Sequence, residues 1–472
     1  MADPLNAPFS GRELHFIGIG GAGMSGLAIV ARALGARVTG SDLAESSYCR
    51  PLRAAGIEPV IGHDAANLPE GAEVVVSTAI PEDNPELAAA RGAAATVLHR
   101  GELLGELSRM KRTIAVGGTH GKTTTASMAA LALLESGREP AFLIGGELRA
   151  AGTNAAWGAG EWAVIEADES DRSFLKLGRD VAVVTNIELD HHATYANLGE
   201  LREAFEEFAA PAGVRVLGPG VELAGEGEVV AFGIEEGCID EGRIEAGSEA
   251  PRGRLRAEWP RGRLCAENVR LHRGSSSFKV DGVEVELQVP GEHNILNALA
   301  ALAALRAAGV PVAEAAPGLA RFTGAGRRFE AHGRTPSGAL VYDDYAHHPT
   351  EVTATVAAAR TLEPRRLVAC FQPHLYSRTR MLAREFGRAL ALADLVVVLD
   401  VYPARERAED FPGVSGLLVA QAAADAASGR PVWWLPRIDD AERQLRAELT
   451  EGDLLLTLGA GNVDELARRL SA

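Results

Sequence analysis

The stretch "AVGGTHGKTTTAS" (residues 115–127) follows a short apolar run and leads into an alanine-rich segment typical of a helix. In a strand, glycine loop and helix of this kind, successive backbone N–H groups and the helix N-terminus surround phosphate oxygens. Lys122 would bridge the β and γ phosphates of a nucleotide, and the Thr123 hydroxyl would hold Mg²⁺. Val116 stands where G-x-x-x-x-G-K-[ST] has its first glycine. The alternative is a tight turn with a surface lysine, and the surrounding motifs favour the phosphate loop.

Acidic and imidazole side chains follow the next two apolar runs. A carboxylate cluster ends the run "VIEADESD", and its members are Glu166, Asp168, Glu169 and Asp171. The run "VVTNIELDHH" ends with Asp190, His191 and His192. Ligands of parallel sheets collect outside the carboxyl ends of the strands, and carboxylate oxygens suit a hard cation. Alone, an acidic loop is usually a solvated surface; after a phosphate loop, these groups predict a magnesium site for ATP.

A second glycine loop stands near the N-terminus, in "LHFIGIGGAGMSGLA" (residues 14–28). Gly18, Gly20 and Gly23 fit G-x-G-x-x-G, and Asp42 stands where an NAD enzyme keeps its ribose-binding acid. A lone glycine fingerprint is weak evidence, because a helix N-terminus accommodates any diphosphate. The motif by itself leaves open an oxidoreductase and another nucleotide-linked substrate.

Composition narrows the class of protein. The 472 residues include 64 acidic and 47 basic side chains, a formal charge of −17, which argues against a nucleic-acid or anionic-membrane partner. The four cysteines, Cys49, Cys238, Cys265 and Cys370, form no CxxC pair, as expected of reduced thiols in a cytoplasm. The N-terminal residues have no signal-peptide pattern, and no run reaches the roughly 18 apolar residues of a membrane span. We expect a cytoplasmic protein without membrane insertion.

The pattern of apolar runs predicts three α/β domains in series. Residues 1–108 alternate short strands and alanine-rich helices, as in a Rossmann-like domain. Residues 109–321 hold the phosphate loop and an added β segment, in which Asp281-Gly282 predicts a hairpin turn. Residues 322–472 return to clean alternation and form a second Rossmann-like domain.

The motifs of the whole chain resemble those of the Mur ligases, ATP-dependent amide-forming enzymes of peptidoglycan precursor synthesis, and thus of cell-wall biogenesis, cell shape and division. The resemblance runs in order through "HFIGIGGAGMSGLA", "GTHGKTT", "EADESDRSF", "TNIELDHH", "GEHNILNALAA", "GAGRRFE", "DDYAHHPTEV", "FQPHLYSRT" and "LGAGN". "FQPHLYSRT" is similar to the alanine-adding branch. The resemblance implies domains for the UDP-sugar, for ATP, and for closure over the site.

The resemblance also implies ligand positions. Those for ATP are Gly118, Thr119, His120, Gly121, Lys122, Thr123, Thr124, Asn297, Arg328 and Asp344. Those for Mg²⁺ (or Mn²⁺) are Thr123, Glu166 and His191. Those for the UDP-sugar are Gly20, Gly21, Ala22, Gly23, Met24, Ser41, Asp42 and Arg327. The first glycine loop would thus bind UDP, and a nicotinamide dehydrogenase would leave "GTHGKTT" unexplained.

We place the amino-acid site in the third domain. An arginine suits the substrate carboxylate, because its fork donates two parallel hydrogen bonds and it does not compete for the amine. Arg378 is the expected clamp, while Arg380 is expected to start the next helix and to face solvent. Pro349 suits the first turn of a helix, which leaves Tyr345 and His347 in the loop before it. For His347, a role in proton loss from the ammonium and a purely structural role stay equally open.

Two positions depart from the family pattern: His192, followed by Ala193, stands where relatives carry Met and an acid, and Leu375 replaces a basic residue. The segment "ELREAFEEF" (residues 200–208) has no lysine, as in the alanine-adding branch, whereas sister ligases carry a carbamylated lysine there.

The implied reaction joins L-alanine to the carboxylate of UDP-N-acetylmuramate through an acyl phosphate, with Lys122, His191, His347 and Arg378 as the catalytic set. We expect a monomer or weak homodimer. A nucleotide-binding switch would not explain the C-terminal motifs. The nearest alternative is a sibling ligase that adds another amino acid or a peptide.

Overall fold

The computed structural model describes residues 7–192, 194–235 and 262–471. Two compact units divide these residues. The first unit holds the described residues of Met1–Gly233, Leu255–Cys265 and Asn297–Leu319. The second unit holds those of Ile234–Arg254, Ala266–Leu296 and Ala320–Ala472. Cys238 lies outside the described residues, as does Ala193.

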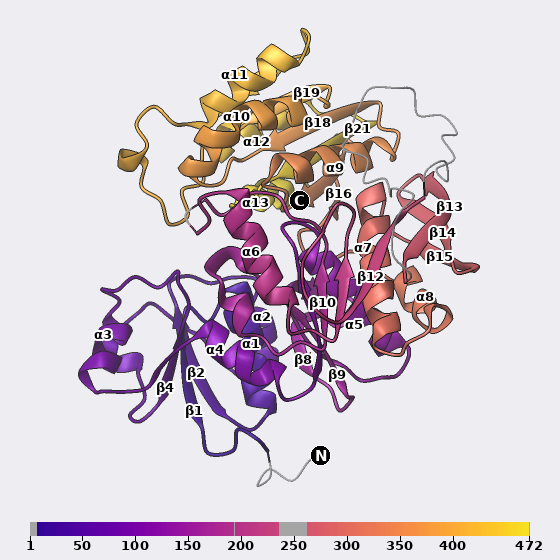
Figure 1. Ribbon diagram of the computed structural model, residues 1–472. Helices are drawn as coiled ribbons and strands as arrows, with labels where there is room; N and C mark the ends of the chain where they lie inside the picture. The colour runs from indigo at the N-terminus through magenta and orange to yellow at the C-terminus, as the bar shows by residue number, and fades with distance from the viewer. Residues whose placement is uncertain (1–6, 193, 236–261, 472) are drawn as a thin grey trace. The chain divides into compact units, whose positions relative to one another are not determined.

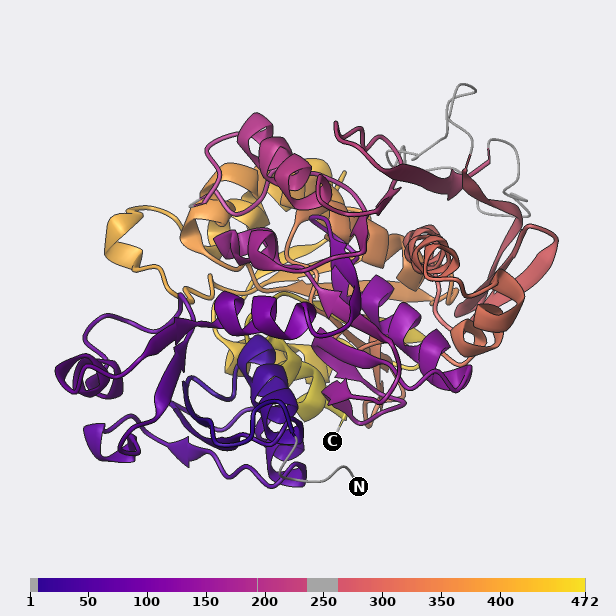
Figure 2. The same cartoon turned by 60° about the horizontal axis from the view of Figure 1, so that its bottom comes forward.

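The first sheet confirms the Rossmann-like prediction for the N-terminal region. Its strands are all parallel, in the order β3-β2-β1-β4-β5. They are β1 (Glu13–Ile17), β2 (Arg37–Asp42), β3 (Val60–Ile61), β4 (Glu73–Val76) and β5 (Val97–His99). Its helices are α1 (Ala22–Ala33), α2 (Cys49–Ala54), η2 (Ala65–Asn67), α3 (Pro85–Gly92) and α4 (Arg100–Ser108). Figures 1 and 2 show these helices, in indigo and violet, beside the strands.

The second sheet contains the phosphate loop at a point where the strand order changes direction. Within the first unit its order is β12-β11-β10-β6-β9-β7-β8. The strands are β6 (Arg112–Gly117), β7 (Ala141–Leu148), β8 (Thr153–Trp157), β9 (Trp162–Glu166), β10 (Val181–Val184), β11 (Val214–Leu217) and β12 (Glu228–Ile234). β9 and β10 are the parallel neighbours of β6, so the loops after all three strands meet at one edge.

Helices cover this sheet and close its core. They are α5 (Lys122–Glu135), η3 (Glu169–Asp171), η4 (Ser173–Lys176), α6 (Leu198–Ala209), most of α7 (Glu292–Ala307) and α8 (Val312–Ala320). Phe174 of η4 stacks on Phe208 of α6, with ring centroids 5.0 Å apart. A Cβ added to Gly117 would lie 3.2 Å from the Phe208 ring, so this aromatic cluster packs directly beneath the start of the phosphate loop.

The second unit contains an antiparallel segment and the third sheet. The segment comprises most of β13 (Leu264–His272), β14 (Ser275–Val280) and β15 (Val283–Leu287). Asp281 and Gly282 join the last two strands with φ angles of 50° and 78°. Two positive φ values are the signature of a type I′ turn, so the hairpin prediction is confirmed.

The third sheet has the order β16-β17-β21-β18-β19-β20, parallel except for its first pair. Its strands are β16 (Glu330–Arg334), β17 (Leu340–Asp344), β18 (Arg366–Phe371), β19 (Leu395–Val398), β20 (Val432–Trp434) and β21 (Asp453–Leu458). Its helices are α9 (Pro349–Arg360), α10 (Tyr376–Leu390), η5 (Ala408–Asp410), α11 (Gly416–Ala426), α12 (Ile438–Glu448) and α13 (Val463–Ser471). The predicted α/β class with three such regions in series is confirmed, whereas the boundaries at residues 108 and 321 stay predictions.

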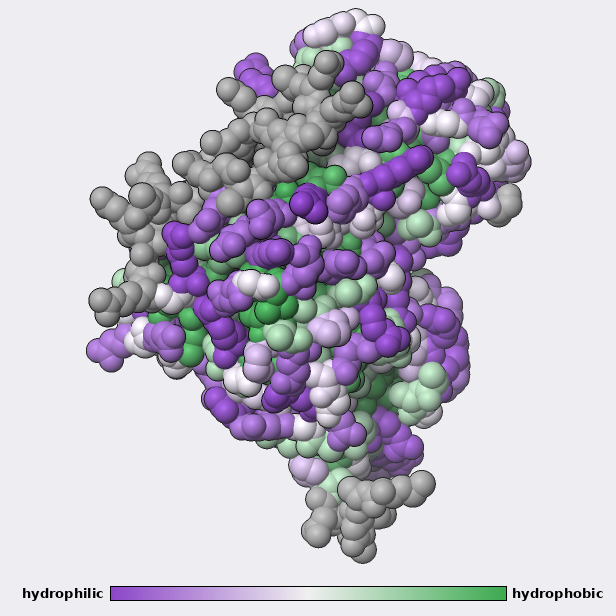
Figure 3. All heavy atoms as spheres, turned by 90° about the vertical axis from the view of Figure 1, so that its right-hand side faces the viewer, coloured by the Kyte–Doolittle hydropathy of each residue, from purple (hydrophilic) through white to green (hydrophobic). Residues whose placement is uncertain are grey.

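One face of the molecule carries many hydrophilic residues (Figure 3). Figure 3 shows hydrophilic side chains over most of one face, interrupted by smaller hydrophobic areas. Among the described residues, every helix is too short or too polar to cross a bilayer.

Candidate active site

The loop between β6 and α5 requires glycine at two positions. Gly118 has a φ of 122° and Gly121 a φ of 84°, a region that side chains strongly disfavour. A Cβ on Gly118 would collide with the Thr185 hydroxyl, and one on Gly121 with the Asn297 carboxamide. The two glycines therefore let the backbone turn closely between β10 and α7 before α5 begins at Lys122.

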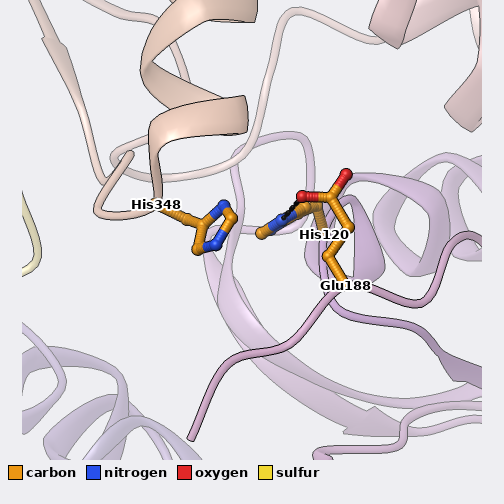
Figure 4. A group of neighbouring side chains, drawn as sticks. All are labelled: His120, Glu188 and His348. Carbon is orange, nitrogen blue, oxygen red and sulfur yellow. Dashed lines mark hydrogen bonds and ion pairs between the residues drawn. The ribbon is translucent and has the colours of Figure 1, made fainter. Parts of the chain in front are cut away.

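The segment that follows β10 holds this loop in place. The Thr119 amide donates to the Asn186 carbonyl (3.0 Å), and the His120 amide donates to the Asn186 Oδ1 (2.9 Å). The Thr119 hydroxyl donates to the Glu188 carbonyl (2.9 Å). The His120 ring lies 3.4 Å from a Glu188 carboxylate oxygen, the contact drawn as a dashed line in Figure 4. Asn186 thus fixes the loop, a role that its position in the sequence did not indicate.

Lys122 lies inside a shell of oxygen atoms. Its Nζ donates to the carbonyls of Gly118 (2.7 Å) and Thr119 (3.1 Å) and lies 2.9 Å from the Glu169 Oε2. Burial by itself would lower the pKa of Lys122, but the nearby carboxylates, Glu169 first among them, raise it overall. The ammonium is therefore charged at the start of α5, where phosphate oxygens are best stabilised.

The carboxylates at the end of β9 and just after it form two groups near this lysine. Glu166 accepts from the Thr123 hydroxyl (3.1 Å) and from the Gly145 amide (2.7 Å). Glu169 is 1% exposed, and its Oε1 lies 3.4 Å from the His191 Nε2. Asp168, Glu169 and His191 each offer one ligand atom, all within 4.8 Å of one another. The predicted metal ligands Thr123, Glu166 and His191 are therefore divided between two neighbouring groups.

The charges of the second group depend on one another. Burial would raise the pKa of Asp168, but Arg100, Lys122 and His191 hold it well below its usual range. Burial would lower the pKa of His191, but Glu169, Asp190 and Asp168 raise it overall. Carboxylate and hydroxyl oxygens are the ligands Mg²⁺ prefers, so the residues present fit this ion. Arg100 was absent from the predicted site, whereas Glu169 was predicted only as a member of the carboxylate cluster.

Asn297 joins the same site from α7. It is buried, and its Oδ1 lies 3.4 Å from the Thr125 hydroxyl of α5, next to Gly121. The prediction that this residue approaches the nucleotide fits its place beside the loop, although a contact with the base stays a prediction.

The first glycine loop uses part of its hydrogen-bonding capacity internally. The Gly20 amide donates to the Asp42 Oδ2 (2.8 Å), and the Gly21 amide donates to the Gly18 carbonyl (3.1 Å). Asp42 therefore supports the loop. The helix α1 begins at Ala22, so the amides of Ala22, Gly23 and Met24 form its first turn and have no intrahelical acceptor. A diphosphate would be met by these three amides.

Ser41 contacts this loop through its backbone, because its carbonyl accepts from the amides of Gly18 (2.8 Å) and Ile19 (2.9 Å). Its side chain is fully buried, and its hydroxyl donates to the Glu86 Oε2 (2.6 Å). Glu86 also lies 2.9 Å from His15 and accepts from Asn67 (2.8 Å). Burial would raise the pKa of Glu86, but these hydrogen bonds lower it to about 2. The Ser41 side chain thus belongs to a buried network that joins β1, β2 and α3, and its contact with the UDP-sugar stays a prediction.

In the second unit, two residues predicted to bind nucleotides form hydrogen bonds within the protein itself. The Arg327 guanidinium donates to Asp343 (3.0 Å) and to the carbonyls of Gly461 (2.9 Å) and Gly459 (2.7 Å). Asp344 accepts from the amides of Phe329 (2.7 Å) and Ala346 (2.8 Å), and its burial raises its pKa to about 6. Arg327 and Asp344 therefore fix the loops around β17 and β21, and their contacts with UDP and with the ribose stay predictions.

The residues predicted for the amino acid lie close together in the same unit. The ring centroids of Tyr345 and His347 are 5.3 Å apart, and those of His347 and His374 are 6.1 Å apart. The Arg378 Nη1 lies 3.2 Å from the His374 Nδ1. Tyr402 stacks on His374 with centroids 5.8 Å apart, and neither of these two residues was predicted.

The helices beside this cluster differ in part from expectation. α9 begins at Pro349, as predicted, and the His348 ring, also labelled in Figure 4, caps it by accepting from the Thr350 amide. α10, however, begins at Tyr376 and not at Arg380. Arg378 therefore lies in its first turn and is 3% exposed, whereas Arg380 is exposed as expected.

Glu351 of α9 connects this cluster to a predicted nucleotide contact. It accepts from the His347 amide (3.0 Å), and its other oxygen lies 3.6 Å from the Arg328 Nη1. Arg328 also stands over the Tyr345 ring, 5.3 Å from its centroid. Glu351 lies inside a quoted motif, "DDYAHHPTEV", but its type alone gave no reason to single it out.

Comparison with known proteins shows which enzymes the chain is similar to. The family models described as "Mur ligase family, catalytic domain", "Mur ligase middle domain" and "Mur ligase, glutamate ligase domain" match residues 13–112, 116–216 and 327–461. The UDP-N-acetylmuramate–L-alanine ligase of Acidithiobacillus ferrooxidans is 46% identical over 97% of this chain and 96% of its own length. That of Streptomyces coelicolor is 46% identical with the same coverage.

Two solved structures of ligases are similar in fold to this chain. The UDP-N-acetylmuramate–alanine ligase of Thermotoga maritima has a TM-score of 0.78 and 28% identity, covering 97% of this chain and 98% of its own. A murein peptide ligase from Psychrobacter arcticus has a TM-score of 0.70 and 24% identity, covering 98% of both chains, which is a likeness of fold.

Proposed function

This chain belongs to the Mur ligase family, and from that premise we propose that it joins L-alanine to the carboxylate of UDP-N-acetylmuramate at the expense of ATP. The observation that carries the proposal is the near-full-length identity of 46% with relatives named for this reaction. The reaction belongs to peptidoglycan precursor synthesis. Two free thiols, Cys49 and Cys370, support action in the reducing cytoplasm. A monomer or weak homodimer is our expectation for its assembly.

The phosphate loop supplies the first step. The muramate carboxylate attacks the γ-phosphate of ATP, which gives an acyl phosphate and ADP. Positioning and charge neutralisation accomplish most of phosphoryl transfer, because the migrating group requires cations more than a covalent partner. Lys122 is the protein's own cation here, and Asn297 beside the loop supports nucleotide binding.

Mg²⁺ (or Mn²⁺) fits the groups around Lys122. Either Thr123 with Glu166, or His191 with Asp168 and Glu169, would hold it. The ion would supply further positive charge for the phosphate oxygens.

The cluster around His374 is proposed to receive the amino acid. In the second step the alanine amine attacks the acyl phosphate and phosphate leaves. Arg378 offers a guanidinium for the substrate carboxylate, and His347 lies in the same cluster, where it could accept a proton from the ammonium.

A phosphate-release assay tests the proposal. We expect ATP-dependent phosphate release that requires both UDP-N-acetylmuramate and L-alanine, with weaker release for glycine or serine. A panel that includes the tripeptide substrate of a sibling ligase separates the nearest alternative. Release with the tripeptide but not with alanine would contradict the proposed amino acid.

A further inference from the structure

Arg100 lies at the same edge of the first sheet as the glycine loop after β1. It is the first residue of α4 and directly follows β5. His99 caps this helix, because its Nδ1 accepts from the Gly101 amide (3.2 Å). β1 and β5 belong to one parallel sheet, so the loops after both strands meet at its carboxyl edge, where ligands bind.

Two carboxylates orient the Arg100 guanidinium. Its Nη2 donates to the Asp171 Oδ2 (2.8 Å) and to the Asp168 Oδ2 (3.1 Å), and its Nε donates to the Asp171 Oδ2 (3.2 Å). Close packing of α4 on η4 sets this arrangement, since a Cβ on Gly101 would lie 2.5 Å from the Ser173 Cβ. The guanidinium is therefore fixed by groups of the second sheet.

The third guanidinium nitrogen of Arg100, Nη1, points away from these carboxylates. Among the residues that the structure describes, the Arg100 Nη1 has no hydrogen-bond acceptor. A Cβ added to Gly23 would lie 3.1 Å from this nitrogen, so Nη1 faces the first turn of α1. The side chain is 19% exposed and can be reached from solvent. A cation and the positive end of a helix thus face each other, and an anion between them would neutralise both.

We propose that Arg100 binds the diphosphate of the UDP-linked substrate, with Nη1 donating to a phosphate oxygen while Nε and Nη2 stay on Asp171 and Asp168. The inference rests on the proposed function, which brings a UDP-linked substrate to this loop. Asp168 also lies beside Glu169 and His191. Arg100 therefore connects the substrate's diphosphate to the groups proposed for phosphoryl transfer.

Binding of UDP, measured by calorimetry on the full chain, tests this role. We expect Arg100→Ala to weaken UDP binding at least tenfold, because a charge-assisted hydrogen bond at a helix N-terminus is lost. Arg100→Lys should recover part of the affinity, since it keeps the charge without the fork. Arg91→Ala is the matched control, an exposed arginine of the same unit paired with Glu82, and should bind UDP like the wild type.

Gly23→Ala probes the same contact without removing the arginine. The position lies in the first turn of α1, where alanine favours the helix, so the fold should be retained. The added methyl group presses on Nη1, and we expect severalfold weaker UDP binding. Uridine, which has no phosphate, should bind equally to the wild type and to all these variants.

The outcomes separate the two proposals. A wild-type protein that does not bind UDP would contradict the proposed function itself. If the wild type binds UDP but Arg100→Lys and Gly23→Ala match it, the role of Arg100 is overturned. An equal loss of uridine and UDP affinity in Arg100→Ala would also overturn it, because the arginine would then only support the fold.

Discussion

The two glycine loops of the first unit share a backbone plan and differ in the side chains around it. Both follow a parallel strand and end in a helix N-terminus. In the first, Asp42 supports the loop by accepting from the Gly20 amide, and the nearby cation, Arg100, comes from another helix. In the second, Lys122 belongs to the loop's own helix and is surrounded by carboxylates. In our proposal the backbone recognises phosphate in both loops, and the side chains decide whether phosphate is only bound or also transferred.

Removing the lysine of the second loop should have the largest effect. We expect Lys122→Ala to lower the ligation rate about a thousandfold or more, because a cation that stabilises the transferring phosphoryl group is worth several kcal/mol. UDP binding should stay within about twofold of the wild-type value, since the first loop is unchanged. Phosphate release and UDP calorimetry measure the two effects. Lys279→Ala is the control, because Lys279 forms an exposed pair with Glu284. Near-normal turnover in a folded Lys122→Ala variant would contradict the role of Lys122.

The two loops should also differ in their need for metal, because the residues proposed to bind Mg²⁺ lie beside the second loop. EDTA should abolish activity, and Glu166→Ala or His191→Ala should lower the rate about 100-fold and raise the Mg²⁺ concentration required, because each removes a ligand. A magnesium titration of phosphate release measures both changes. Glu161→Ala, at an exposed pair with Arg112, is the control. Undiminished activity in EDTA would contradict a metal role.

The features of the two loops that the sequence predicted correctly were mostly local ones. The order strand, glycine turn, helix was evident at both loops, as was the Asp281-Gly282 turn, because each depends on neighbouring residues. The ion pair of Lys122 with Glu169 joins residues 47 positions apart, and that of Arg100 with Asp171 joins residues 71 apart, so only folding reveals them. The start of α10 was missed because Leu375, with a φ of 70°, precedes it in place of a capping side chain such as Ser or Asp.

A third region should respond independently of both loops. Arg378→Lys keeps the charge but loses the fork, so we expect the KM for alanine to rise about tenfold. The KM values for ATP and for the UDP-substrate should change by less than about twofold. Steady-state kinetics with each substrate varied in turn measures them, and Arg380→Lys, an exposed neighbour on α10, is the control. If the constants for ATP and alanine rise together, Arg378 is structural and the carboxylate binds elsewhere.

The smallest effect should come from Asp42, the acid that supports the first loop. Asp42 accepts from the Gly20 amide, and a Cβ on Gly20 would lie 3.0 Å from that same carboxylate oxygen. Asn keeps an acceptor for this amide, so Asp42→Asn should leave the KM for the UDP-substrate within about twofold. Asp42→Ala removes the acceptor and should raise that KM about fivefold, because one hydrogen bond that shapes the loop is worth about 1 kcal/mol. The KM for ATP should not respond to either substitution. A shift of the ATP constant as large as that of the UDP-substrate would show that Asp42 supports the whole unit, and the two loops would then not be independent.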